Sequence, residues 1–169
     1  MYFLELARTR YSVRGYSDRP IEKEKLDYIL ECGRLAPSAT NAQPWKLYVV
    51  TRPELRAKIF ECYPREWMKN APVYIVVSVN ESLAWVRGYD GRNHAEVDGS
   101  IITEHLCLAA ADCGLGSCWI CAFDPYKCSE ILQLPDVVRP IAIIPIGYPL
   151  SDTVPEKKRK PLNEIVEFL

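Results

Sequence analysis

The sequence predicts one domain that combines helices with a central β-sheet, of the α/β or the α+β class. Helical and strand-like patterns alternate along its 169 residues, as is typical of a sheet with helices on its faces. A nearly continuous run of β-branched residues at 73–79 indicates a strand that is covered on both faces. Apolar residues make up 49% of the chain, enough for a sizeable core in a single domain spanning 1–169.

The first half of the chain is expected to contain a helix, a strand and a second helix before the buried strand. Apolar residues recur at helical spacing over 21–35, and Pro20 and Pro37 flank that segment as helix boundaries. The segment 45–51 (WKLYVVT) has the composition of a strand. Pro53 then begins a helical pattern (PELRAKIFECY), because proline suits the first turn of a helix.

The second half is expected to contain a long helix, a short strand, a short helix and a last strand. The long helical pattern covers about 95–113 and ends before Gly114, a residue suited to a helix C-cap. A short strand is predicted at 117–121, a short helix at 124–132 opened by Asp124 and Pro125, and a buried strand at 137–146.

Two other segments are expected to lie outside this framework. The Gly- and Arg-containing segment 81–93 is the best candidate for a mobile loop. The stretch 151–159 is charged and contains proline, and the apolar residues return after it at Leu162, Ile165, Val166 and Phe168. This return predicts a C-terminal segment that is docked on another surface.

Charge and hydropathy exclude several classes of partner. The chain has 21 basic and 22 acidic side chains and a net charge of -1, which disfavours a nucleic-acid partner. No apolar stretch approaches the length of a membrane span. Arg8 and Arg10 follow the apolar start of the chain, which is the reverse of the order in a signal peptide. We expect a cytoplasmic protein with no membrane partner.

The seven cysteines suggest a second interpretation, a metal or thiol-redox protein. Cys113, Cys118, Cys121 and Cys128 are spaced loosely like ligands of zinc or of an iron–sulfur cluster. Against this, no second CxxC is present, and the one CxxC lies in a predicted strand rather than at the start of a helix. There Cys118 and Cys121 would face opposite sides. An odd number of cysteines also favours reduced thiols, so we predict buried structural thiols and no metal ligand.

Four polar segments could bind a ligand. Residues 8–14 (RTRYSVR) carry guanidinium and hydroxyl groups suited to a phosphate or a carboxylate. Residues 36–45 (APSATNAQPW) concentrate small residues, hydroxyls and amides between a helix and a strand. Residues 114–123 (GLGSCWICAF) contain two glycines that permit close approach of a ligand, without the third glycine of a dinucleotide fingerprint. Residues 157–161 (KKRKP) form a basic run. Taken singly, the two basic segments are also explained as solvated surface. An ordinary turn would explain the Ser and Asn of residues 36–45 but not Gln43, Pro44 and Trp45.

Together these segments resemble the nitroreductase family. RYSVRGYSDRPI is similar to its N-terminal R-x-S-x-R-x-[FY] signature, and APSATNAQPW to its AP-S-x-x-N-x-QPW signature. GLGSCWICAFDP, PIGYP and KKRKPL resemble its GLG segment, a strand end and its C-terminal K-x-R-x-P. The resemblance covers almost the whole chain. It implies an α+β fold with a central mixed β-sheet flanked by helices, and a homodimer with one FMN at each end of the interface.

The resemblance also implies how FMN is bound. Arg10 and Arg159 would hold its phosphate, helped by Ser12 and Lys157, while Arg14 would reach the N1/O2 side of the ring. The backbone N–H groups of Cys121 and Ala122 would face N5 and O4, and the segment 37–41 would come from the other subunit. The residues expected to bind the cofactor are Arg10, Tyr11, Ser12, Arg14, Pro37, Ser38, Ala39, Asn41, Cys121, Ala122, Lys157 and Arg159.

The activity implied by the resemblance is transfer of hydride from NAD(P)H, through FMN, to a nitroaromatic, a quinone or a similar small acceptor in a ping-pong cycle. No side chain is assigned as catalytic, because the flavin carries the chemistry. A flavin store or sensor, a dehalogenase or a flavin-cleaving enzyme on the same fold is the alternative. Two departures from the family are the missing helical insertion over the flavin, which implies a more open site, and the closely spaced Cys118 and Cys121.

Overall fold

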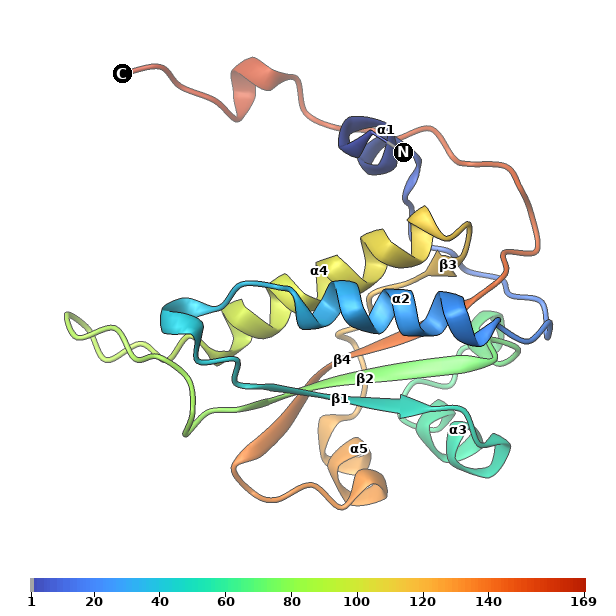
Figure 1. Cartoon of the computed structure of the whole chain (residues 1–169), viewed down its shortest axis with the longest axis horizontal. Helices are drawn as coiled ribbons and strands as arrows, with labels where there is room; N and C mark the ends of the chain where they lie inside the picture. Colours follow the sequence, from blue (N-terminus) through green and yellow to red (C-terminus); the bar gives the residue numbers. More distant parts are fainter. Residues whose placement is uncertain (1) are drawn as a thin grey trace.

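The computed structural model describes residues 2–169 and shows a four-stranded sheet between two layers of helices (Figure 1). The strands lie in the order β1-β2-β4-β3 and are β1 (Trp45–Val50), β2 (Val73–Asn80), β3 (Gly116–Ser117) and β4 (Val138–Gly147). The helices are α1 (Phe3–Thr9), α2 (Lys23–Arg34), α3 (Pro53–Phe60), α4 (Ala95–Asp112) and α5 (Pro125–Leu132). Three short 3-10 turns are η1 (Ala39–Asn41), η2 (Glu66–Met68) and η3 (Leu162–Glu164).

The predicted α+β class, with a central sheet flanked by helices, is confirmed. The three strand pairings are antiparallel. Within residues 2–169, the parallel part of the expected mixed sheet is one isolated bridge between Ser12 and Ser117. In Figure 1, α2 and α4 cover one face of the sheet, and α3 and α5 cover the other.

Strand β2 connects the two cores of the molecule. It pairs with β1 on one side and with β4 on the other, and its residues 73–79 are all buried. Successive side chains of a strand point to opposite faces. Ile75 therefore packs with α2 and α4, whereas Tyr74 and Val76 pack on the side of α3 and α5. The strand predicted from its continuous β-branched run is thus covered on both faces.

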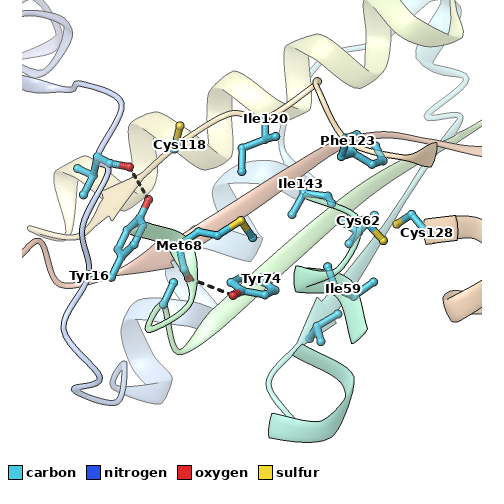
Figure 2. Packing of buried hydrophobic residues seen from close by; sticks show 14 residues of the cluster. Tyr16, Ile59, Cys62, Met68, Tyr74, Cys118, Ile120, Phe123, Cys128 and Ile143 are labelled. Atoms are coloured by element: carbon cyan, nitrogen blue, oxygen red, sulfur yellow. Dashed lines mark hydrogen bonds between the residues drawn. The ribbon is translucent and has the colours of Figure 1, made fainter. Parts of the chain in front are cut away.

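The core on the α3 and α5 side also fixes the N-terminal segment (Figure 2). Tyr16 is buried, and its hydroxyl donates hydrogen bonds to the carbonyl oxygens of Val13 (3.0 Å) and Pro145 (3.2 Å). The second bond joins the segment after α1 to β4, which lies more than a hundred residues later in the chain. The two ends of the chain are thereby brought to one side of the sheet.

The structure differs from the predicted elements at two places. Helix α1 was not expected, because seven residues are too few to show a clear helical period. The strand predicted at 117–121 is shorter, since the ladder with β4 ends at Ser117 and pairing returns only as one bridge between Ile120 and Ile143. By contrast, the carboxylate of Asp124 caps α5 as predicted, accepting from the backbone N–H groups of Tyr126 and Lys127 at 3.0 Å each.

The C-terminal tail extends away from the body of the domain beyond α1 (Figure 1). Its apolar side chains Leu162, Ile165, Val166 and Phe168 are exposed. The predicted docking surface for this tail is therefore not found on the tail's own subunit within residues 2–169. No helix in that described part of the chain is long and apolar enough to cross a membrane.

Candidate functional site

The segment that follows α1 is held between two other parts of the chain. On one side the backbone N–H of Val13 donates to the carbonyl of Ser117 (2.9 Å). On the other side the N–H of Leu150 donates to the carbonyl of Gly15 (3.1 Å). A Cβ on Gly116 would lie only 2.6 Å from Cγ2 of Val13, so glycine is needed there for the segment to reach β3. The sequence RYSVR is thereby fixed against the sheet.

Two adjoining pockets follow this segment. One, of about 320 Å³, is lined by Arg10, Gly114 and Gly116 among others. The second, of about 350 Å³, is lined by Ser12, Arg14 and Thr153 among others. Both pockets share Tyr11, Val13, Pro149 and Ser151, so they adjoin each other along the N-terminal segment and residues 149–155. We call the two pockets together the terminal groove.

Three cations gather beside α1, and one of them, Arg10, lines the first pocket of the terminal groove. Partial burial, together with the positive charges of Arg10 and Arg159, lowers the pKa of Lys157 below that of an ordinary lysine. The ammonium of Lys157 donates to the carbonyl of Ala7 in the last turn of α1, where backbone carbonyls favour a cation. The carboxylate of Glu104 lies 4.0 Å from Nε of Arg10. Asp152 also lines the first pocket, and three cations against these two carboxylates still leave net positive charge, which suits a bound anion.

Arg14 lies further along the groove and rests on an aromatic ring. Its guanidinium carbon is 6.0 Å from the ring centroid of Trp67, within range of a cation–π interaction. Trp67 is itself supported by the rings of Tyr16 (6.4 Å) and Tyr63 (6.1 Å). Sequence reasoning did not assign Trp67 to the site, because it is remote in sequence and belongs to no recognised motif.

The segment after β3 runs beside Arg14 and then becomes exposed. Cys118 is buried, and this burial raises the pKa of its thiol despite the opposing effects of Arg14, of a hydrogen bond with Ser12 and of Arg10. The group is therefore a neutral thiol rather than a thiolate nucleophile at pH 7. Cys121 is exposed, so the prediction of buried thiols is wrong for this residue: the chain leaves the sheet before reaching it.

A third pocket, of about 260 Å³, adjoins Cys121. It is also lined by Trp119, Arg92 and Glu96. The indole Nε1 of Trp119 is buried and has no hydrogen-bond partner among residues 2–169. All seven cysteines are free thiols, and the described chain contains no group of three or more His, Cys, Asp or Glu side chains placed to hold a metal.

The structure separates the predicted site residues into two groups. In the first group, Arg10, Tyr11, Ser12 and Arg14 line the terminal groove, and Lys157 and Arg159 lie beside Arg10. The group also includes Cys121, which lines the third pocket, and Ala122 next to it on the segment after β3. The second group, Pro37, Ser38, Ala39 and Asn41, lies at the N-terminal end of α4, where the backbone N–H of Ala39 donates to the buried carboxylate of Asp98 (3.0 Å). Sequence reasoning missed Asp98, which lies within a helix and outside the four motifs.

The two groups lie at different parts of the subunit. Asp98 precedes Glu104, the ion-pair partner of Arg10, by six residues of α4, or about 9 Å at the rise of an α-helix. Within residues 2–169 no hydrogen bond or ion pair joins the segment 37–41 to the first group. The subunit alone therefore presents two separate parts of the predicted site.

Comparison with known proteins gives a consistent match. A model of the nitroreductase family matches residues 7–63 and 60–148. A protein of Methanothermobacter thermautotrophicus named "Putative NADH dehydrogenase/NAD(P)H nitroreductase" is 36% identical over 157 residues, covering 90% of this chain and 80% of the relative. The FMN reductase (NAD(P)H) of Bacillus subtilis is 30% identical over 170 residues, covering 91% and 68%. The crystal structure of a nitroreductase family protein from Clostridium difficile superposes with a TM-score of 0.90 at 38% identity, covering 99% of this chain and 98% of that one.

Proposed function

Because the chain belongs to the nitroreductase family, we propose that it is an FMN-dependent NAD(P)H oxidoreductase. Its acceptor is a nitroaromatic, a quinone or a similar small molecule, and the active form is a homodimer. The observation that carries the proposal is the cluster of Arg10, Lys157 and Arg159 beside the terminal groove. The names of the relatives, among them an FMN reductase, support the same cofactor.

The cation cluster fits the phosphate of FMN. A phosphate dianion is held best by charge-assisted hydrogen bonds, and arginine can supply two parallel donors. The lowered pKa of Lys157 reflects the partial burial of its ammonium and its repulsion from Arg10 and Arg159, and an anion placed among these cations would relieve that repulsion. Glu104 offsets one of the charges and leaves the others available.

The remaining groove residues fit the rest of the cofactor. Arg14, which rests on the ring of Trp67, would place a positive charge beside one edge of the flavin ring. The backbone N–H groups of Cys121 and Ala122 would hold the opposite part of the ring, since both residues are exposed on the adjoining segment. When bound, FMN supplies the hydride transfer. The chain binds and orients, and we assign no catalytic side chain.

The homodimer is supported by two segments whose expected contacts are not made within one subunit. Within residues 2–169 the segment 37–41 makes no hydrogen bond or ion pair to the groove residues of its own subunit, and the apolar tail at 162–168 is exposed. In a two-fold dimer each subunit can supply the same segment to the other. We propose that the segment 37–41 of one subunit covers FMN in the terminal groove of its partner.

The experiment that tests the cofactor assignment compares FMN with riboflavin, which lacks the phosphate. We expect one FMN per subunit in the purified protein, by its absorption spectrum, and much weaker binding of riboflavin. Arg159→Ala should weaken the binding of FMN by about ten- to hundredfold, the loss expected for a charge-assisted hydrogen bond. The same variant should leave the affinity for riboflavin unchanged. Equal affinities for FMN and riboflavin in the native protein would contradict a phosphate site.

The experiment that tests the activity follows NADH and NADPH oxidation with nitroaromatic and quinone acceptors. Parallel lines in double-reciprocal plots are expected, because donor and acceptor would use one open site in turn. A protein that binds FMN tightly and turns over with neither nicotinamide would instead be a flavin store or sensor, which the binding residues do not distinguish from a reductase.

A further inference from the structure

The loop formed by residues 38–43 has an unusual and fixed backbone. Thr40, Asn41 and Gln43 all have positive φ angles, of 54°, 57° and 48°. Asparagine adopts this conformation readily, but for the β-branched Thr40 it is an outlier. The loop is braced internally, because the backbone N–H of Gln43 donates to Oγ of Ser38 (2.9 Å) and its side-chain amide donates to Oδ1 of Asn41 (3.0 Å).

Only one hydrogen bond ties this loop to the rest of the subunit. Within residues 2–169, the bond from the N–H of Ala39 to Oδ1 of Asp98 is the sole hydrogen bond between residues 38–42 and an element outside the loop. The loop side chains Thr40, Asn41 and Gln43 are exposed. Asp98 therefore sets where an otherwise self-contained loop sits on the end of α4.

The buried carboxylate of Asp98 is unfavourable for the stability of the subunit. It is 1% exposed, and its Oδ2 is buried without a hydrogen-bond partner in the described chain. A buried carboxylate with one unpaired oxygen costs stability, although the positive end of α4 reduces that cost. What the residue provides in return is the acceptor that fixes the position of the loop.

We infer that Asp98 is a positioning residue for the FMN site of the partner subunit. It fixes Ala39, and through Ala39 the loop whose segment 37–41 covers FMN in the partner's terminal groove. The inference rests on the proposed shared site. It adds that the cofactor affinity of one groove is set by a carboxylate buried in the other subunit, which does not touch the cofactor.

The first test removes the hydrogen bond from each of its two sides. Asp98→Ala removes the acceptor. Ala39→Pro removes the donor and suits the local backbone, because Ala39 is the first residue of η1 and Ser38 before it is extended (φ -140°, ψ 160°). Both variants should weaken FMN binding by about tenfold or more, as for the loss of a hydrogen bond to a charged group. Asp98→Asn keeps an oxygen acceptor and should restore most of the affinity.

The decisive test asks in which subunit Asp98 acts. Asp98→Ala and Arg159→Ala subunits are co-expressed with different tags, and the mixed dimers are isolated by purification on both tags. One groove of each mixed dimer then combines the intact cations of the Asp98→Ala subunit with the intact loop of the Arg159→Ala subunit. We expect native FMN affinity at about half of the sites, because the two-fold dimer has two equivalent sites.

The absence of native sites in the mixed dimer would contradict the inference. If Asp98 acts on the groove of its own subunit, each site of the mixed dimer carries one defect, no site binds FMN with native affinity, and the inference is wrong. Mixed dimers of Ala39→Pro with Arg159→Ala must give the same result, which keeps the test open if Asp98→Ala does not fold. Failure of the native protein to bind FMN would instead overturn the proposed function.

Discussion

At the scale of single residues, the arginines of the terminal groove differ in what they face. Arg159 belongs to the cation cluster with Lys157, whereas Arg14 rests on Trp67 beside the expected ring. A positive charge near the ring stabilises negative charge that develops there on reduction. Arg14→Ala should therefore lower the reduction potential of bound FMN and slow its reduction by NAD(P)H at saturating FMN.

Potentiometry with a reference dye measures this effect. Arg159→Ala is the matched control, because its charge faces a phosphate that does not change during turnover, and its potential should equal that of the native protein. Should Arg14→Ala alter only the affinity for FMN, Arg14 belongs with the phosphate-binding residues.

Lys157 predicts how cofactor binding depends on pH. Burial and the charges of Arg10 and Arg159 lower its pKa, so it loses its positive charge at a lower pH than an ordinary lysine. A bound phosphate favours the charged form and raises the pKa again. FMN affinity should therefore fall as the pH rises through the lowered pKa, with uptake of a proton on binding in that range.

Titration calorimetry from about pH 7 to about pH 10, below the pKa of an unperturbed lysine, in two buffers of different ionisation enthalpy measures both effects. Lys157→Gln should bind more weakly at neutral pH and lose most of the pH dependence. A native affinity that is constant over this range would show that Lys157 does not contact the phosphate.

The site was predictable to the extent that it is made of local motifs. Arg10, Ser12 and Arg14 are recognisable because they recur within a few residues of one segment. Asp98 was missed, and Trp67 could not be assigned to the ring edge, because each acts through a contact with a residue distant in sequence, Ala39 in one case and Arg14 in the other. Such contacts are set by packing and leave no periodic signal in the chain.

At the scale of elements, prediction succeeded where an element has a period or a cap of its own. β2 has its nearly continuous β-branched run, α4 its length, and α5 its Asp124 cap. It failed at β3, where the two-residue strand is defined by its pairing with Gly147 and Ile146 of β4 rather than by its own composition. The segment that carries Val13 also approaches this strand closely at Gly116.

This close approach gives a prediction at the same scale. Gly116→Ala places a methyl group 2.6 Å from Cγ2 and 2.9 Å from Cβ of Val13, and a β-branched side chain can adjust little. We expect a loss of about 1–3 kcal/mol in the free energy of unfolding, the range for overpacking of a core. FMN binding should also weaken, because the displaced segment carries Arg10 and Arg14.

Urea denaturation and FMN titration measure the two quantities. Gly88→Ala is the matched control, since a Cβ there meets no atom within 4 Å, and it should change neither quantity. Unchanged stability and affinity in Gly116→Ala would mean that the segment is held mainly by its backbone bonds to β3 and to residues 148–150.

At the scale of the whole molecule, both ends of the chain converge on the groove and then continue past it. Lys157 and Arg159 contribute to the cation cluster, and the tail that follows them carries apolar side chains away from the domain (Figure 1). Residues 157–168 thus connect cofactor binding to the expected partner surface. The apolar residues of this tail predicted such a surface but did not show where it lies.

Deletion of residues 161–169 tests this connection, because it removes the tail and keeps Lys157 and Arg159. Leu162, Ile165 and Phe168 are 69%, 64% and 95% exposed in the subunit, and burial of such a side chain contributes about 1.5–3 kcal/mol. The dimer should therefore dissociate at least about tenfold more readily, as measured by analytical ultracentrifugation. FMN should be lost at the protein concentrations at which the truncated dimer dissociates, since the segment 37–41 leaves with the partner.

The full-length variant Asn163→Ala, which changes an exposed polar residue of the same tail, should behave as the native protein. A truncated protein with native dimer affinity would place the tail outside the interface, and a truncated monomer that holds FMN with native affinity would show that each subunit completes its own site.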